Sequence, residues 1–158
     1  MIRVVLLAGT VIVVDQITKA IVLAHLVPGV IIELSGWLSL TLVMNPGLAF
    51  GLLAGVPPSW RWAVAALSLV ALVVLARVAL RVLPTDGWPG QVAVGLIFGG
   101  AVGNLIDRAR WGAVVDFVDA HWRGYHWPAF NVADSAITVG VALLAFRLVL
   151  SPPPPTPR

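Results

Sequence analysis

Seven acidic residues are present in the 158-residue chain, and they are the side chains best suited to chemistry. Four of them lie within a short stretch: Asp107, Asp116, Asp119 and Asp134. The chain has no cysteine, which excludes a thiolate nucleophile, a disulfide and a zinc–thiolate centre. No serine–histidine motif is evident, and the three histidines show no metal-ligand spacing. The remaining nucleophile is a water molecule activated by carboxylates.

Two aspartates that face each other can activate such a water molecule. At close range both cannot be ionised, so the pair shares one proton. One carboxylate then acts as general base on the water, while the other protonates the carbonyl group under attack. The acids therefore favour hydrolysis at a pair of aspartates, with no metal and no other cofactor.

The composition indicates that these acids belong to a membrane protein. Hydrophobic residues make up 59% of the chain and charged residues only 11%, whereas a soluble domain usually carries about 25% charged residues. Ionisable groups at membrane depth are costly and mark functional sites. The net charge of +3 comes from basic residues scattered along the chain, so no nucleic-acid partner is indicated.

Four apolar runs must position the acids. Four membrane helices of about 20 residues each, together with their loops, account for the length of the chain. The expected helices cover residues 2–26, 60–83, 91–105 and 133–150. The run 60–83, with tryptophan and arginine at its ends, is the clearest span. The first run contains Asp15 and Lys19, which a secretory signal peptide would not tolerate, so we expect a retained helix. We predict an all-α integral membrane protein with four transmembrane helices in one domain over 1–150, and a proline-rich tail over 151–158.

The loops 27–59 and 106–131 are expected to connect these helices outside the cytoplasm. Residues 38–42 alternate apolar and polar side chains, which predicts a half-buried strand in a small extracytoplasmic β-sheet. Nine basic residues lie near the ends of the expected helices. On one side of the membrane the count is five, Arg3, Arg77, Arg81, Arg147 and Arg158, and on the other it is four, Arg61, Arg108, Arg110 and Arg123. This excess slightly favours cytoplasmic termini.

Five sequence blocks resemble one known family. They are Asp15-Gln16-x-x-Lys19, Asn45-Pro46-Gly47-Leu48-Ala49-Phe50-Gly51, Gly99-Gly100-Ala101-Val102-Gly103-Asn104-Leu105-Ile106-Asp107-Arg108, Val114-Val115-Asp116-Phe117 and Phe130-Asn131-Val132-Ala133-Asp134-Ser135. In this order they resemble the bacterial lipoprotein signal peptidases, or signal peptidase II. The resemblance implies an intramembrane aspartyl endopeptidase of the bacterial cytoplasmic (inner) membrane, without a metal and inhibited by globomycin. It also implies the substrate: a diacylglyceryl-modified prolipoprotein, cut on the N-terminal side of its lipidated cysteine.

The resemblance implies roles for individual residues. Asp116 and Asp134 would form the catalytic dyad. The substrate site would be lined or braced by further polar residues: Asn45, Asn104, Asp107, Arg108 and Asn131. Asp15 and Lys19 would support the site from the first helix. Pro46 departs from the family pattern, because many relatives have a residue with an N–H group at this position.

Simpler structural interpretations stand beside these roles. Asn131 and Asp134 have the spacing of an N-cap and the third residue of the fourth helix. Asp15 and Lys19, four residues apart, have the spacing of an intrahelical ion pair.

Other charged residues also allow a structural interpretation. Asp107 and Arg108 have the position of an ion pair at the membrane interface. For Asp119 and Glu33 we expect solvated loop charges and no role in the site.

Two alternatives come from other functional classes. A small four-helix proton-coupled transporter or channel would use aspartates as a relay: Asp15, Asp107, Asp116 and Asp134. A relay needs carboxylates spread through the membrane depth, whereas three of these four are expected at or beyond helix ends on one side. A non-catalytic scaffold would have no use for a pair of aspartates. The expected partners are therefore lipid-modified prolipoproteins and membrane lipids, with the oligomeric state open and compatible with a monomer.

Overall fold

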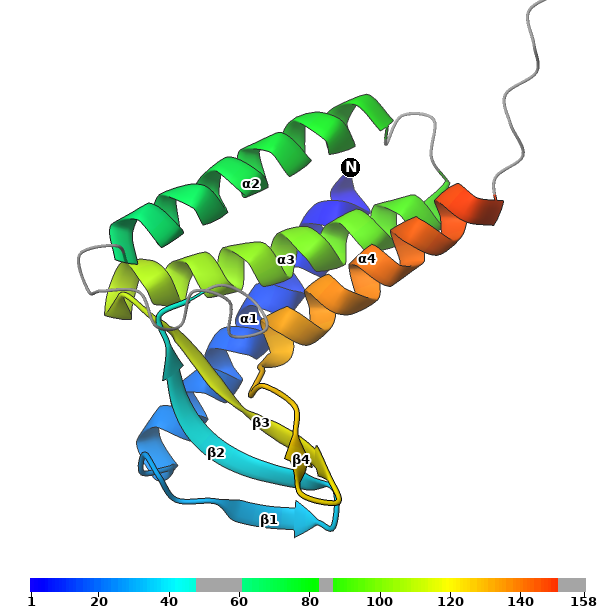
Figure 1. The fold of residues 1–158 in the computed structure, drawn as a ribbon. Helices are drawn as coiled ribbons and strands as arrows, with labels where there is room; N and C mark the ends of the chain where they lie inside the picture. The colour runs from blue at the N-terminus through cyan, green and yellow to red at the C-terminus, as the bar shows by residue number, and fades with distance from the viewer. Residues whose placement is uncertain (48–60, 83–86, 151–158) are drawn as a thin grey trace, which may run out of the picture.

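The computed structural model describes residues 1–47, 61–82 and 87–150. Part of the 45–51 block, the ends of the second apolar run and the proline-rich tail lie outside this range. In chain order the elements are α1 (Ile2–His25), β1 (Ile32–Ser35), β2 (Leu38–Asn45), α2 (Arg61–Val82), α3 (Trp88–Trp111), β3 (Val114–Trp122), β4 (Tyr125–His126) and α4 (Val132–Leu150). The sheet lies at the end of the helices where α1 ends and α4 begins (Figure 1).

Helix α3 is at the centre of the helical part, where it packs against α1, α2 and α4 (Figure 1). Glycines allow this close packing. A Cβ atom added at Gly99 would lie 2.6 Å from Cβ of Val11 on α1, and one at Gly100 would collide with the carbonyl oxygen of Ala133 on α4. Small residues let helices approach closely where no water competes for their backbones.

Two helices in the described part of the chain are long and apolar enough to cross a membrane. They are α1 and α3, each 24 residues long, with mean hydropathies of 1.8 and 1.4. Helix α1 also carries many large apolar side chains on its exposed surface: Ile2, Val5, Leu6, Val13, Val14, Ile17, Ile21 and Leu23. A helix that is apolar on its outer faces is suited to lipid, so the two helices favour a membrane protein. Helix α2 covers 22 residues, and its apolar segment is described over Trp62–Arg77, so the prediction that the second run is the clearest span stays a prediction.

Helix α3 is longer than predicted at both ends. It begins at Trp88 with Pro89 in its first turn, and it ends where Gly112 takes a left-handed conformation with φ of 66°. The prediction that a loop begins at residue 106 is therefore wrong. The apolar run stops at the polar residues near 104, but their side chains have partners on α1, so the helix continues through them.

The sheet has the strand order β1-β2-β3-β4, with antiparallel pairing throughout. The predicted strand at 38–42 is confirmed as part of β2. Its burial does not alternate simply, since Ser39 and Leu42 are the buried residues and the register shifts between Leu40 and Val43. The strand β3, predicted as loop, was missed because its first four residues are all buried and show no alternation.

Apolar side chains join the sheet to the end of α1. Val22 of α1, Leu42 of β2, and Val115 and Phe117 of β3 form one buried cluster. This cluster fixes the start of β3 beside α1, which brings Asp116 to the ends of α3 and α4.

Candidate active site

Asp116 lies on β3, and its carboxylate is bound by two side-chain amides. The amide nitrogen of Asn45, at the end of β2, donates to Oδ2 at 2.9 Å. The amide nitrogen of Asn131 donates to Oδ1 at 2.7 Å. Only 1% of the Asp116 surface is exposed. Both oxygens of a buried carboxylate are thus held in a fixed orientation.

Asn131 also starts helix α4 and thereby positions Asp134. Its amide oxygen accepts a hydrogen bond from the backbone N–H of Asp134 at 2.9 Å, so the predicted N-cap is confirmed. The carboxylate of Asp134 accepts a hydrogen bond from the amide nitrogen of Asn104 at 2.7 Å. Asn131 in turn donates to the amide oxygen of Asn104 at 3.2 Å. Two asparagines therefore connect the carboxylates of Asp116 and Asp134.

The predicted ion pair on α1 forms and has an additional partner. Lys19 Nζ lies 2.8 Å from Asp15 and 2.7 Å from Asp107 of α3. It also donates to the amide oxygen of Asn104 at 3.0 Å. At most 2% of the surface of each of these three charged residues is exposed. The lysine therefore connects a buried ion-pair network to the asparagines that hold the two carboxylates.

The two acids of this network each bind a backbone N–H group of the site. Asp15 accepts from the N–H of Ala133 in the first turn of α4, at 2.9 Å. Asp107 accepts from the N–H of Val115, next to Asp116, at 3.1 Å. A carboxylate at a helix start is favoured by the unpaired N–H groups there. The network thus sets the position of both elements that carry the two aspartates.

Arg108 does not pair with Asp107, so the expected interfacial pair is not formed. Its guanidinium donates to the carbonyl oxygens of Gly47, at 2.7 Å, and Asn104, at 3.4 Å. The N–H of Gly47 donates to the side chain of Asn45 at 2.9 Å, which closes a turn around Pro46. This turn uses no N–H at position 46, so proline fits there.

Burial and charge change the proton affinity of Asp116. Burial raises its pKa to about 7, and the nearby charge of Asp134 acts in the same direction. The hydrogen bonds from Asn45 and Asn131 and the charge of Lys19 oppose the rise. Asp116 therefore titrates near neutral pH, in the range where a carboxyl group can both give and take a proton.

An apolar hollow of about 430 Å³ lies between α2, α3 and α4, and its polar end contains Asp134. Its lining is mostly aliphatic: Leu67, Ala71, Leu72, Leu75, Ile97, Ala101, Val114 and Ile137. Asn45, Asn104 and Arg108 line it together with Asp134. An elongated apolar ligand could therefore lie beside the carboxylate.

The structure brings together all nine residues singled out from the sequence, in one connected set of contacts. It adds Gln16, whose side chain donates to Asp107 at 3.0 Å and accepts from Arg110 at 3.2 Å. Gln16 stands in the first sequence block, but nothing in its local pattern indicated these partners.

Two expectations for residues outside this site differ in outcome. Glu33 on β1 is exposed, as expected of a solvated charge. Asp119 on β3 is buried and hydrogen-bonded to His126, so the expectation of a solvated loop charge is wrong. The histidine spacing was misleading as well, because strand pairing brings His121 and His126 beside Asp119.

The fold and the site together define a class: a helical membrane protein in which buried, amide-bound carboxylates adjoin an apolar hollow. This arrangement suits hydrolysis of a substrate held in the membrane. A family model for signal peptidase (SPase) II matches residues 7–150. The chain belongs to this family and is therefore a membrane protease.

Individual relatives agree with this assignment. The chain is 46% identical over 144 residues to the lipoprotein signal peptidase of Syntrophotalea carbinolica, covering 90% of this chain and 88% of the relative. It is 48% identical over 143 residues to that of Geobacter sulfurreducens, with 87% and 85% covered. Two solved structures, each described as a bacterial membrane enzyme, have similar folds. The first has a TM-score of 0.74 and 36% identity, with 92% of this chain and 87% of that chain covered. The second has a TM-score of 0.76 and 32% identity, with 94% of each chain covered.

Proposed function

We propose that this protein removes the signal peptide from diacylglyceryl-modified prolipoproteins, cutting on the N-terminal side of the lipidated cysteine, with Asp116 and Asp134 as an aspartyl dyad. The observation that carries the proposal is the pair of asparagines that connects these two buried carboxylates. Charged groups are expensive to bury, and a fold without chemistry to perform would gain nothing from two such groups. Family membership supports the same activity.

The reaction follows from the two environments. Asp116, with its pKa near 7, carries the proton in the free enzyme and donates it to the carbonyl oxygen of the scissile peptide bond. Asp134, ionised at the start of α4, takes a proton from water as the water oxygen bonds to the carbonyl carbon. The tetrahedral intermediate then breaks its C–N bond. Asp134 passes its proton to the leaving amine of the lipidated cysteine, and Asp116 recovers its own from the intermediate.

The surrounding polar residues act by position. Asn45, Asn104 and Asn131 hold the carboxylates through the hydrogen bonds described above, and the buried ion pairs of Lys19 hold the elements that carry them. Arg108 keeps one more donor: its Nε is buried and makes no hydrogen bond within the described residues. Since Arg108 lines the hollow, this N–H can bind a carbonyl oxygen of the substrate and fix the register of the peptide.

The substrate's lipid would supply much of the affinity. The hollow beside Asp134 is mainly aliphatic. Acyl chains that enter it would gain about 0.8 kcal/mol per buried CH₂ group. Because the cysteine belongs to the substrate, an enzyme without cysteine can perform this reaction.

For the topology we assign four membrane spans, both termini in the cytoplasm, and one domain over residues 1–150 in the bacterial cytoplasmic membrane. The sheet and the site would then lie toward the outer face. The lengths of α1 and α3 and the position of the sheet at one end of the helices support this assignment. Because the chain has no cysteine, single cysteines at Glu33 and Arg3 give a direct test. An impermeant thiol reagent added outside the cell should label the first and not the second.

The rival transporter has less support. A relay needs carboxylates at successive depths, whereas Asp107 near the end of α3, Asp116 on β3 and Asp134 at the start of α4 lie at one end of these elements. Asp15, in the middle of α1, contacts the same network through Lys19 and the N–H of Ala133. The pair is therefore better suited to a single site than to a path across the membrane.

Substitution of the two aspartates tests the proposal. Asp116→Asn and Asp134→Asn should each lower cleavage of a lipidated prolipoprotein by at least about a hundredfold, because an amide keeps the shape but cannot transfer the proton. The double variant should be little worse than either single variant. Glu33→Gln is the matched control, an acid-to-amide change at an exposed position, and should cleave normally. Substantial turnover by either purified dyad variant would overturn the assignment.

A further inference from the structure

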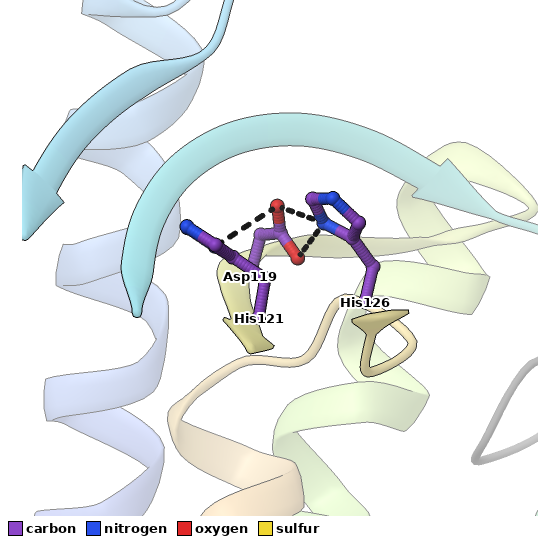
Figure 2. Close-up of side chains that lie close together, drawn as sticks. All are labelled: Asp119, His121 and His126. Atoms are coloured by element: carbon purple, nitrogen blue, oxygen red, sulfur yellow. Dashed lines mark hydrogen bonds and ion pairs between the residues drawn. The ribbon is translucent and has the colours of Figure 1, made fainter. Parts of the chain in front are cut away.

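One aspartate and two histidines converge at the β3–β4 hairpin (Figure 2). One side-chain ligand atom from each of Asp119, His121 and His126 lies within 4.8 Å of the others. His126 Nδ1 is 3.0 Å and 2.9 Å from the two carboxylate oxygens of Asp119, and His121 Nδ1 is 3.9 Å from one of them. We propose that these three side chains bind one divalent transition-metal ion, with Zn²⁺ the best match.

The backbone holds the three side chains on one face of the hairpin. His121 and His126 are direct partners across the two strands. The two residues between the strands, Arg123 and Gly124, both have positive φ, at 50° and 85°, as a tight two-residue hairpin turn requires. Asp119 precedes His121 by two residues and so projects from the same face of β3. The cluster is therefore positioned by strand register and not by a loop.

Two buried polar atoms beside Asp119 have no hydrogen-bond partner within the described residues: His121 Nδ1 and Ser39 Oγ. Ser39 is the direct partner of Asp119 across β2 and β3, and only 1% of its surface is exposed. Unpaired buried polar atoms are rare because each one costs free energy. A metal ion would take His121 Nδ1 as a ligand, and a water molecule on the ion would give Ser39 a hydrogen-bond partner.

The ligand set and the available space fit zinc. Two imidazoles and one carboxylate are ligands that Zn²⁺ prefers, with a water molecule completing a tetrahedron. At metal–ligand distances of about 2.0–2.1 Å, tetrahedral ligands lie roughly 3.4 Å apart. The His121 ring, which is stacked on His126 with centroids 5.1 Å apart, would therefore turn toward the ion. His121 and His126 line an open hollow of about 560 Å³ walled by Trp37 and Trp122, and this hollow gives an ion its entry path.

The metal site would be separate from the proposed dyad. Asp119 follows Asp116 by three residues on β3, about 10 Å along the strand at roughly 3.3 Å per residue. The two carboxylates have different partners: Asn45 and Asn131 bind Asp116, whereas His126 contacts Asp119. A bound ion would thus join β4 to β3 and stabilise the hairpin, without touching the hydrolytic site.

The test uses the full chain in detergent micelles, purified without a polyhistidine tag and treated with a chelator. Titration calorimetry with Zn²⁺ alone should give one ion per chain, and the ion should raise the melting temperature. Asp119→Asn and His126→Gln should each weaken binding by at least about tenfold. His25→Gln is the matched control: it removes the remaining histidine, which lies exposed in the last turn of α1, and should bind zinc as the wild type does.

His126 is more than half exposed at its side chain, so its replacement leaves the fold intact even if Asp119→Asn does not fold. Prolipoprotein cleavage by His126→Gln should match the wild type, which separates this test from that of the dyad. Absence of a one-to-one zinc isotherm in the wild type would overturn the proposal. Binding of equal strength in wild type and His126→Gln would also overturn it, and would leave the Asp119–histidine contacts as an ion pair alone.

Discussion

Asn131 donates a hydrogen bond to the carboxylate of Asp116 at 2.7 Å while its amide oxygen accepts one from the backbone of Asp134 at 2.9 Å. One side chain therefore orients one carboxylate and begins the helix that carries the other. Capping and site geometry are not competing interpretations here, because the same amide performs both.

This double contact predicts different results for two substitutions. Asn131→Ala loses the cap, which costs about 1 kcal/mol of stability, and also frees the Asp116 carboxylate. Asn131→Asp keeps an oxygen for the cap but replaces the donor to Asp116 with a negative charge. We expect both variants to lose most cleavage activity. Asn131→Ala loses the stability of the cap, whereas Asn131→Asp keeps the cap and loses stability through a second buried charge beside Asp116, a loss that falls at low pH where the carboxyls are protonated. Melting temperature and activity per folded molecule separate the effects, and normal activity in Asn131→Asp would show that the hydrogen bond to Asp116 is dispensable.

Lys19 predicts a loss of stability. Its removal in Lys19→Met leaves the buried carboxylates of Asp15 and Asp107 without their counter-ion, and breaking a buried pair in this way costs about 3–5 kcal/mol. We expect a large drop in melting temperature, with smaller loss of activity per folded molecule. The control is Arg110→Gln, which removes only an exposed hydrogen bond to Gln16 and should change stability little. Full stability with abolished cleavage would instead move Lys19 into the chemistry.

The helices were predictable because long apolar runs determine where a membrane helix forms. The end of α3 was not, since Asn104, Asp107 and Arg108 end the apolar run while their partners lie on α1 and beyond β2. Such contacts between distant segments leave no trace in local periodicity. The same reason hid β3, which is buried along its first half.

The residues of the candidate site were likewise predictable only in part. The capping role of Asn131 and the ion pair of Asp15 with Lys19 followed from spacing alone, because both are local in the chain. The connection of Asp116 with Asp134 rested on family resemblance, since it runs through Asn131 at the start of α4 and Asn104 on α3, which is distant in the chain. Asp119 was missed because cross-strand register, which no single strand reveals, sets its neighbours.

The hollow predicts that bulk within it blocks the substrate. Ala101 on α3 lines the hollow, so Ala101→Phe should fill part of it and raise KM for the lipidated prolipoprotein by about tenfold or more, with little change in melting temperature. Val13→Phe, on the exposed face of α1, is the control for adding an aromatic ring to the protein. A prolipoprotein without its diacylglyceryl group should be cut poorly by the wild type and by both variants. Equal cleavage of lipidated and unlipidated substrate would contradict lipid recognition in the hollow.

The pKa of Asp116 predicts the pH dependence of cleavage. In the proposed mechanism its proton is needed, and this group titrates at about 7. The value of kcat/KM, which reports groups of the free enzyme, should therefore fall as pH rises through that value. The pair titrates as a coupled unit, so an infrared titration with Asp116→Asn and Asp134→Asn should identify the carboxyl that holds the proton. A rate independent of pH across neutrality, or a protonated band on Asp134, would reverse the assigned roles while keeping both residues in the site.

The same shift makes stability depend on pH, with a definite sign. The pKa of Asp116 is 3.8 before the effects of the fold and about 7 within it. Between these values the unfolded chain has released a proton that the folded chain retains, so the unfolded state binds fewer protons and the free energy of unfolding falls as pH rises. Asp116→Asn cannot ionise, and it should therefore gain stability relative to the wild type across this window and keep a constant advantage above it. Glu33→Gln, whose side chain is exposed, should follow the wild type. The measurement is the melting temperature of wild type and Asp116→Asn as a function of pH through this range. If the two curves of melting temperature against pH ran parallel, folding would leave the proton affinity of Asp116 unchanged.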